Sequence, residues 1–338
     1  MRRSTVEVEI WRQATQFGNI GAAATLTMLQ LVVIAAVVTT SSRLQRTRSR
    51  SLALRVRSNR LRVASSRQRR LVLAVTVLTG LVVAAPLAAL VERSLRTSDG
   101  HSLRAWRTLG RADSRPGRSV GIDPLESLVE SAKVMVIATV IAVAIGTLAA
   151  IAIAAAHRGG KLLDTAMVLP IATSAITVGF GILITFDQSP VDWRAAWWIV
   201  PIGHALVAVP FVVRTVLPVL RGVEAARLEA AATLGAPPLR AWREVVAPHL
   251  RRPMTAAAGL AAAISLGEFG ATSFLSRSGR ETMPIAIERL LGRTGALLQA
   301  QGYALAVILA AATIAIVMAI DVTQRGADRI VDARMTGR

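Results

Sequence analysis

Long apolar runs dominate the chain, and arginine-rich or polar segments separate them. A helix rises about 1.5 Å per residue, so about 20 apolar residues cross a hydrocarbon core of roughly 30 Å. Seven runs are of about this length, which predicts seven membrane-spanning segments. The predicted segments are Ile20–Thr40, Leu71–Val91, Leu128–Ala156, Thr165–Phe186, Ala195–Leu220, Met254–Leu275 and Tyr303–Asp321.

None of these runs alternates between apolar and polar residues as a barrel strand does. Lipid offers no partner to backbone amides, so an apolar run of this length has to be a helix. The composition agrees, since 53% of the residues are hydrophobic. The predicted fold class is therefore all-α, a polytopic membrane helix bundle of about seven transmembrane helices.

The net charge of +20 first suggests nucleic acid, but the position of the basic residues favours a membrane surface. Arg43–Arg70 holds eleven arginines and no acidic residue, so the positive-inside rule places this run in the cytoplasm. The same orientation makes His157–Asp164, Arg221–Arg252 and the tail after Asp321 cytoplasmic. The run lacks interleaved aromatics and is tied to a bilayer, so we interpret it as a lipid-binding linker and expect no nucleic-acid partner.

The residue inventory argues against enzymatic chemistry. There is no cysteine, which excludes disulfides, zinc–thiolate clusters and cysteine nucleophiles, and no histidine pair stands at metal-ligand spacing. A membrane-embedded enzyme needs several reactive groups at one depth, and the spans offer one glutamate and one histidine in different segments. We expect no catalytic residue, no metal and no cofactor in this chain.

The beginning and the end of the chain share a short sequence pattern. Four residues near the N-terminus recur at a constant offset of 277, and each group is followed by a glycine-containing stretch and an apolar span. The matched residues are Thr5, Val8, Ile10 and Arg12, then Thr282, Ile285, Ile287 and Arg289. We interpret residues 1–42 as the remnant of a preceding repeat with one transmembrane helix, residues 43–70 as a linker and residues 71–338 as a six-helix domain.

The cytoplasmic loop 221–252 has the pattern of two short helices joined by a sharp corner. Val223–Leu234 is good helix-forming sequence, and Gly235 stands where a left-handed C-terminal cap is needed. Pro237 and Pro238 cannot extend that helix but can open a second one, which is amphipathic. Such a loop is suited to docking in a partner's groove, although an ordinary interfacial amphipathic helix would show the same periodicity.

The spacing within this loop resembles the cytoplasmic motif of permease subunits of binding-protein-dependent ABC importers. In that family Glu-Ala-Ala is followed by three residues, Gly, nine residues, Ile, one residue and Leu-Pro. The corresponding residues here are Glu229, Ala230, Ala231, Gly235, Val245, Ala247 and Pro248, with Trp242 on the second helix. Val and Ala replace the family's Ile and Leu. The segments SLGEFGATSFL and TMPIAIERLLGR are also similar to permeases for ferric iron, thiamine and oxyanions.

This resemblance implies a type I importer fold in the bacterial cell membrane, with the substrate pathway and the ATPase on separate subunits. The loop would be the coupling element, seated in a separate ATPase dimer, and an extracytoplasmic binding protein would deliver substrate. The chain has no phosphate-binding loop, since Gly159-Gly160-Lys161 is followed by Leu162, so ATP would be bound by the partner. The resemblance also implies a second permease half, either another copy or a separate subunit. Ferric iron is the first substrate expectation, followed by thiamine and then sulfate or molybdate.

Two ionisable side chains at membrane depth are candidates for the translocation path. Glu268 lies between Gly267 and Gly270, which allow a close helix approach or a break, and His204 lies in the fifth span. A charged group there costs about 2.5–3.5 kcal/mol on insertion scales, so each calls for a reason. Glu268 either borders the path or its gate, or pairs with an arginine of another helix. His204 is either a ligand or an interhelical hydrogen-bonding residue.

Overall fold

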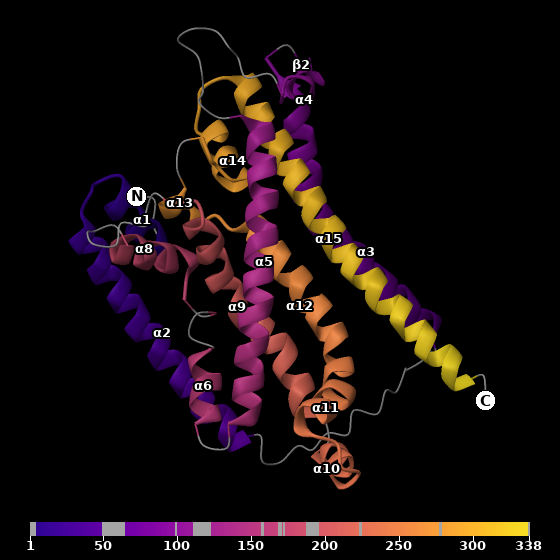
Figure 1. The fold of residues 1–338 in the computed structure, drawn as a ribbon. Coiled ribbons are helices and arrows are strands. Elements are labelled where there is room, and N and C mark those ends of the chain that lie inside the picture. Colours follow the sequence, from indigo (N-terminus) through magenta and orange to yellow (C-terminus); the bar gives the residue numbers. More distant parts are fainter. Residues whose placement is uncertain are drawn as a thin grey trace.

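The computed structural model describes residues 5–48, 65–98, 100–110, 123–156, 159–167, 171, 173–186, 196–222, 225–276 and 279–336. Helices dominate these ranges, as predicted, and the fold is an all-α polytopic bundle (Figure 1). The strands in the described ranges are one antiparallel pair of two residues each, β1 (Arg96–Thr97) and β2 (Gly100–His101). The middle of the arginine-rich linker, residues 49–64, lies outside the described residues.

The helices vary from single turns to rods longer than a bilayer is thick. In chain order they are α1 (Val6–Thr15), α2 (Ile20–Arg48), α3 (Ser66–Leu95), α4 (Arg104–Arg107), α5 (Pro124–Ala155), α6 (Gly160–Ala166), α8 (Ala175–Phe186), α9 (Ile199–Gly222), α10 (Ala225–Thr233), α11 (Pro238–Ala241), the π-helical turn η2 (Trp242–Val246), α12 (Ala247–Gly267), α13 (Thr272–Leu275), α14 (Met283–Leu291) and α15 (Ala296–Thr336).

Three helices, α5, α9 and α12, pack side by side and form the main core (Figure 1). Small residues permit the close approach: a Cβ added to Gly146 of α5 would lie 2.7 Å from the side chain of Val212 on α9. Since lipid is as apolar as leucine, close packing of small residues rather than hydrophobic exclusion holds such helices together. This trio therefore provides a tightly packed scaffold for the loops at both of its ends.

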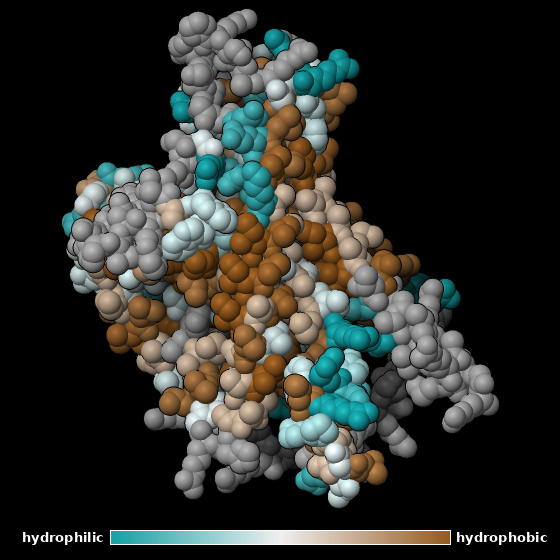
Figure 2. Space-filling model, viewed as in Figure 1, coloured by the Kyte–Doolittle hydropathy of each residue, from teal (hydrophilic) through white to brown (hydrophobic). Residues whose placement is uncertain are grey.

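Helices α3 and α15 pack against each other beside the core, and α15 also contacts α12 and α14 (Figure 1). The membrane-spanning window of α3 has none of its residues buried inside the protein, and its surface is almost wholly apolar. Figure 2 shows apolar side chains across the middle of the molecule and polar ones gathered toward its ends. This distribution is the one a protein surrounded by lipid requires.

The segments expected in the cytoplasm lie at one end of the molecule. The loop with α6, the loop with α10 and α11, the C-terminal end of α15 and the two described ends of the linker are all at the lower end of Figure 1. Helix α14 and the β1–β2 pair lie at the opposite end. The orientation inferred from the arginines is thus consistent with the fold.

Two of the seven expected spans are interrupted. Five helices in the described ranges are long and apolar enough to cross a membrane: Ile20–Ser41 within α2, then α3, α5, α9 and Ala296–Val322 within α15. The fourth expected span, Thr165–Phe186, contains the end of α6 and the short helix α8. The sixth, Met254–Leu275, ends its helix at Gly267 and resumes for one turn in α13. Hydropathy is high in both regions, but the backbone is not continuously helical.

The local backbone geometry marks both interruptions. In the fourth span Ser174 caps a new helix start, since its hydroxyl accepts a hydrogen bond from the Ile176 amide at 3.3 Å. Twelve residues of α8 reach only about 18 Å at 1.5 Å per residue. In the sixth span Glu268 is extended, with φ −74° and ψ 109°, which ends α12. Within the described residues, the fourth and the sixth expected spans therefore each consist of separate helices rather than one continuous membrane-crossing helix.

Candidate functional site

The corner of the cytoplasmic loop is a Schellman motif that ends α10. Gly235 has φ +78°, in the left-handed region. The Ala236 amide donates to the Ala231 carbonyl at 3.0 Å, and the Gly235 amide donates to the Ala232 carbonyl at 2.9 Å. The left-handed cap expected of Gly235 is confirmed. Because open space surrounds the position, the backbone conformation alone demands glycine there.

The second arm of the loop is continuous with a core helix. Pro238 opens α11, and η2 and α12 follow it without a break, so helical backbone runs from Pro238 to Gly267. The π-helical turn holds Trp242 and Val245, and the exposed Pro248 lies in the first turn of α12. Displacement of the loop would therefore move α12 directly, since a helix transmits motion along its axis.

The tip of the loop exposes large apolar side chains. Leu234 is 89% exposed and Leu239 is 70% exposed on the two sides of the corner, and Glu229 and Ala230 of α10 are exposed as well. Nearby, the Arg240 Nε donates to Glu244 at 2.8 Å, a contact that raises the pKa of Arg240 and keeps its charge in place. An apolar tip with polar flanks is the composition of a protein-docking surface.

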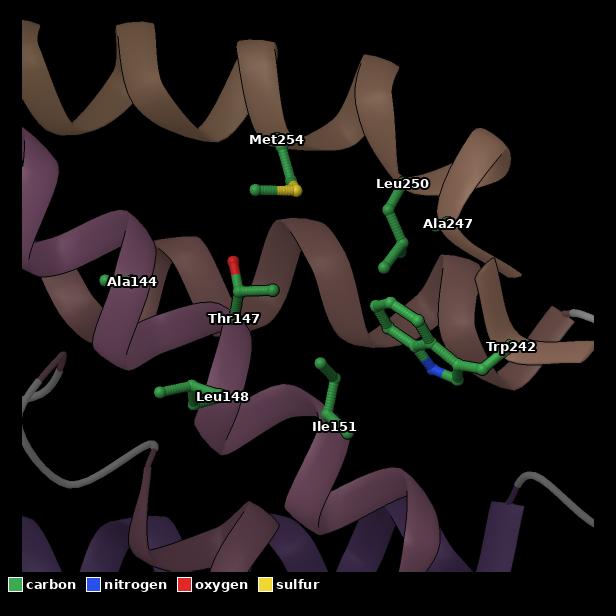
Figure 3. A pocket seen from close by; sticks show the side chains of 8 residues that line it. All are labelled: Ala144, Thr147, Leu148, Ile151, Trp242, Ala247, Leu250 and Met254. Atoms are coloured by element: carbon green, nitrogen blue, oxygen red, sulfur yellow. The ribbon is translucent and has the colours of Figure 1, made fainter. Parts of the chain in front are cut away.

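Trp242 anchors this loop to the core. Its half-buried ring packs against the α5–α9–α12 core and forms one wall of an open groove of about 390 Å³ between α5, η2 and α12 (Figure 3). Thr147 contributes the one hydroxyl, and the rest of the lining is hydrocarbon apart from the indole and the Met254 thioether. The lining residues are Ala144, Thr147, Leu148, Ile151, Trp242, Ala247, Leu250 and Met254.

A buried polar cluster lies at the other end of α12, where the helix breaks. Glu268 is 7% exposed, and one of its carboxylate oxygens accepts a hydrogen bond from the Ala271 amide at 2.9 Å. The carboxylate thus caps the single turn α13 from within its own segment. Of the two alternatives left open by the sequence, the ion pair with an arginine is not found among the described contacts of Glu268.

His204 ties α9 to both sides of that break. It is 1% exposed, its Nδ1 lies 2.9 Å from the Ser265 hydroxyl, and its Nε2 lies 2.6 Å from the Thr272 hydroxyl. The Thr272 hydroxyl donates its single proton to the Glu268 carbonyl at 2.9 Å, so it accepts from Nε2. His204 thus bonds through Nε2 to Thr272 on one side of the break and through Nδ1 to Ser265 on the other.

Glycines let the break pass very close to neighbouring helices. A Cβ on Gly270 would lie 2.8 Å from the Ile176 nitrogen, and a Cβ on Gly179 of α8 would lie 2.6 Å from the Ala271 Cα. Gly203 of α9 is similarly close to Leu275. Gly267, by contrast, is exposed and faces open space. The structure therefore brings His204, Glu268 and Gly270 together, with Gly267 at the edge of the group.

Sequence patterns missed several of these residues. Ser265, Thr272 and Gly179 carry no signal in a single sequence because serine, threonine and glycine are common in membrane helices. Asp164 of α6 was missed as well: it pairs with Arg214 at 3.3 Å and Arg221 at 3.1 Å, both on α9. Within the described ranges no group of three or more His, Asp or Glu side chains is arranged to hold a metal ion.

Comparison with known proteins supports this picture of a loop-bearing membrane bundle. Residues 142–336 match the family model described as "Binding-protein-dependent transport system inner membrane component". The chain is 34% identical over 161 residues to the protein of Salmonella typhimurium named as a 2-aminoethylphosphonate transport system permease protein, PhnV; the match covers 48% of this chain and 60% of PhnV.

Two further relatives are named as transport permeases. The sulfate transport system permease protein CysT of Salmonella typhimurium is 36% identical over 128 residues, covering 35% of this chain and 46% of CysT. The 2-aminoethylphosphonate transport system permease protein PhnU of Salmonella typhi is 27% identical over 220 residues, covering 60% of this chain and 73% of PhnU. The chain thus spans less than two thirds of PhnV and CysT.

Proposed function

The chain belongs to the family of binding-protein-dependent transport system inner membrane components, and from this premise we propose that it builds part of the substrate pathway of an ATP-driven importer. It is a multi-pass protein of the bacterial inner membrane and a transport component rather than an enzyme. The proposed partners are an ABC ATPase dimer, an extracytoplasmic binding protein and a second permease half. ATP would be bound by the ATPase.

One observation carries the proposed coupling to an ATPase. The apolar tip at Leu234 and Leu239 is exposed at the cytoplasmic end, and an unbroken helical rod joins it to α12 in the core. At the other end of that rod lies the cluster of His204, Glu268 and Thr272. When ATP closes the partner dimer, the tip would move with it, and α12 would shift the helix break beside α8 and α9.

For the substrate we propose a small solute that bears a tetrahedral oxyanion group. The relatives support this choice, because the names of PhnV and PhnU specify 2-aminoethylphosphonate and that of CysT specifies sulfate. Phosphonate and sulfate share a tetrahedral centre with negatively charged oxygens. None of these relatives supports ferric iron, the first substrate expectation from the sequence, whereas the oxyanion alternative fits them.

The test of coupling uses the corner glycine. Proline cannot adopt φ +78° and removes the amide that bonds to Ala232, so Gly235→Pro should abolish ATPase binding and uptake while leaving the protein in the membrane. Glu229→Lys, on exposed α10, should weaken the ATPase contact without affecting the core. Gly181→Ala, at an open helical position, is the control. Wild-type uptake by Gly235→Pro would refute the proposal.

The substrate class needs a separate measurement. We expect deletion of the gene to reduce uptake of labelled 2-aminoethylphosphonate, or growth on it as sole phosphorus source, and expression of the chain to restore it. Sulfate uptake in the same strains tests the second member of the class. Unchanged uptake of both anions in the deletion strain would refute the oxyanion assignment and leave the coupling result standing.

A further inference from the structure

The groove between α5, η2 and α12 lies at the depth of one lipid leaflet. Its α5 residues run from Ala144 to Ile151, near the end of that helix at Ala155. At 1.5 Å per residue, the groove extends from about 6 Å to about 17 Å above this end, the one at which the loops expected in the cytoplasm lie. Half of a hydrocarbon core is roughly 15 Å thick. The acyl chains of the cytoplasmic leaflet therefore reach the depth of the groove.

The shape and the lining of the groove suit a hydrocarbon chain. Its volume of about 390 Å³ falls within the roughly 300–1,000 Å³ of small-molecule sites, and Leu148, Ile151 and Leu250 are among its walls (Figure 3). The proposed oxyanion substrate would need several hydrogen-bond donors, and the lining offers it one hydroxyl and one indole. The groove is thus suited to an apolar group rather than to that substrate.

Arginines lie along the cytoplasmic edge of the groove. Arg251 is four residues after Ala247 and three before Met254, and residues at these spacings share one face of a helix. Arg243 follows Trp242 in the π-helical turn. Both arginines are exposed. Figure 2 shows hydrophilic residues over the lower part of α12, next to the hydrophobic surface of α5. An apolar groove therefore adjoins a basic edge.

No described acidic residue neutralises these two arginines. Glu244 is paired with Arg240 at 2.8 Å, and α5 has no acidic residue after Glu130. Among the described residues, the side chains of Arg243 and Arg251 have neither an ion pair nor a hydrogen bond. Guanidinium groups bind phosphate through paired hydrogen bonds, and basic pockets between membrane helices on the cytoplasmic side bind anionic headgroups. The charge of this edge is therefore complementary to a phosphate.

Thr147 presents a further polar group to the groove. It is 9% exposed, and its hydroxyl has no hydrogen-bond partner among the described residues. Figure 3 shows the oxygen directed across the groove toward Met254. Most buried hydroxyls are satisfied, so an unpartnered one calls for a partner from an occupant of the groove. Hydrocarbon alone cannot supply that partner, whereas the ester carbonyls of a glycerolipid can.

We propose that the groove and its basic edge bind one anionic phospholipid of the cytoplasmic leaflet. Its phosphate lies at Arg251 and Arg243, an ester carbonyl accepts from Thr147, and an acyl chain fills the space between α5 and α12. The order fits a phospholipid, because Arg251 is almost one helical turn nearer the cytoplasmic end than Met254, which faces Thr147. This binding goes beyond the proposed function and does not depend on it.

Trp242 provides the reporter, because its ring forms one wall of the groove. The purified full chain is placed in nanodiscs that contain increasing fractions of dibrominated phosphatidylglycerol or dibrominated phosphatidylcholine, since bromine quenches tryptophan emission on contact. Trp242→Phe gives the emission of the other five tryptophans, which is subtracted. We expect half-maximal quenching of Trp242 at an about tenfold lower fraction of the anionic lipid, because two arginines favour it.

The variants separate this site from general contact with lipid. Arg243→Gln together with Arg251→Gln should make the two lipids quench equally, whereas Arg70→Gln, exposed on α3 and outside the lining, should keep the tenfold preference. Ala144→Phe fills the groove and should weaken quenching by both lipids. Equal quenching in the natural chain, which indicates unspecific surrounding lipid, would overturn the inference. So would an undiminished preference without the arginines.

Competition identifies the source of the phosphate group. Inorganic phosphate or 2-aminoethylphosphonate at millimolar concentration should leave the quenching unchanged; relief of quenching by either would place a free anion at the arginines and overturn the inference. The nanodiscs contain no ATPase, so the result is independent of the coupling tested with Gly235→Pro.

A second measurement uses the unpartnered hydroxyl. Because Thr147 has no partner to lose within the described residues, Thr147→Val should leave the free energy of unfolding unchanged. The amount of phosphatidylglycerol that co-purifies in mild detergent, determined by mass spectrometry, should fall about threefold. Retention of the natural amount by Thr147→Val would overturn the inference as stated.

Discussion

Replacing Thr272 with valine tests the buried cluster that holds the helix break. Valine has the shape of threonine but no hydroxyl, so the change leaves the His204 Nε2–H, now 2.6 Å from its acceptor, without a partner. It also removes the bond to the Glu268 carbonyl. Since a buried donor left unsatisfied costs about 1–3 kcal/mol, we expect Thr272→Val to lower the free energy of unfolding by about that amount.

The free energy of unfolding can be measured by titrating the detergent-solubilised protein with dodecyl sulfate and following helix loss or tryptophan emission. Thr272→Ser, which keeps the hydroxyl, is the control and should cost less than Thr272→Val. His204→Leu should be destabilising alone, and the double variant should lose less than the sum, with a coupling of about 0.5–3 kcal/mol. If the two substitutions are additive, or if Thr272→Val is as stable as the natural protein, His204 does not hold the break through Thr272.

Three further predictions concern other contacts. Gly179→Ala should destabilise the protein, because its Cβ would lie 2.6 Å from the Ala271 Cα, whereas Gly181→Ala on the same helix should be tolerated; equal stability of the two in the same titration would contradict the close approach. Arg289→Ala should cost about 1–3 kcal/mol, because it leaves the Glu281 carboxylate, 5% exposed, without its charged hydrogen-bond donor. Glu281→Gln in the same chain should restore part of the loss. Asp164→Asn should cost less than about 1 kcal/mol, because both arginine partners are nearly half exposed, and a large loss would show that this carboxylate does more than join α6 to α9.

The sequence determined the features that depend on residues close together in the chain. The length and apolarity of α2, α3, α5, α9 and α15 follow from hydropathy, because lipid permits an apolar run of that length only one backbone structure. The corner at Gly235 was also predictable, because the helix end, the left-handed cap and the two prolines all depend on residues that are neighbours in the sequence. The side of the membrane stays a prediction from where the arginines lie, and the fold is consistent with it.

Only the tertiary structure decided where the expected fourth and sixth spans break and what holds them. Hydropathy counts apolar side chains and is blind to backbone continuity. The glycines around Glu268 allowed either a close helix approach or a break, and only the structure shows that α12 ends at Gly267 and that α13 begins at Thr272. The bonds that stabilise this break come from His204, 61 and 68 residues away from its partners Ser265 and Thr272. Likewise, the repeat in the sequence linked Ile10 to Ile287, but only packing showed that Ile10 is fully buried beside Phe180, whereas Ile287 is half-buried. Contacts between residues so far apart depend on how helices meet in space, and a single sequence has no local signal for that.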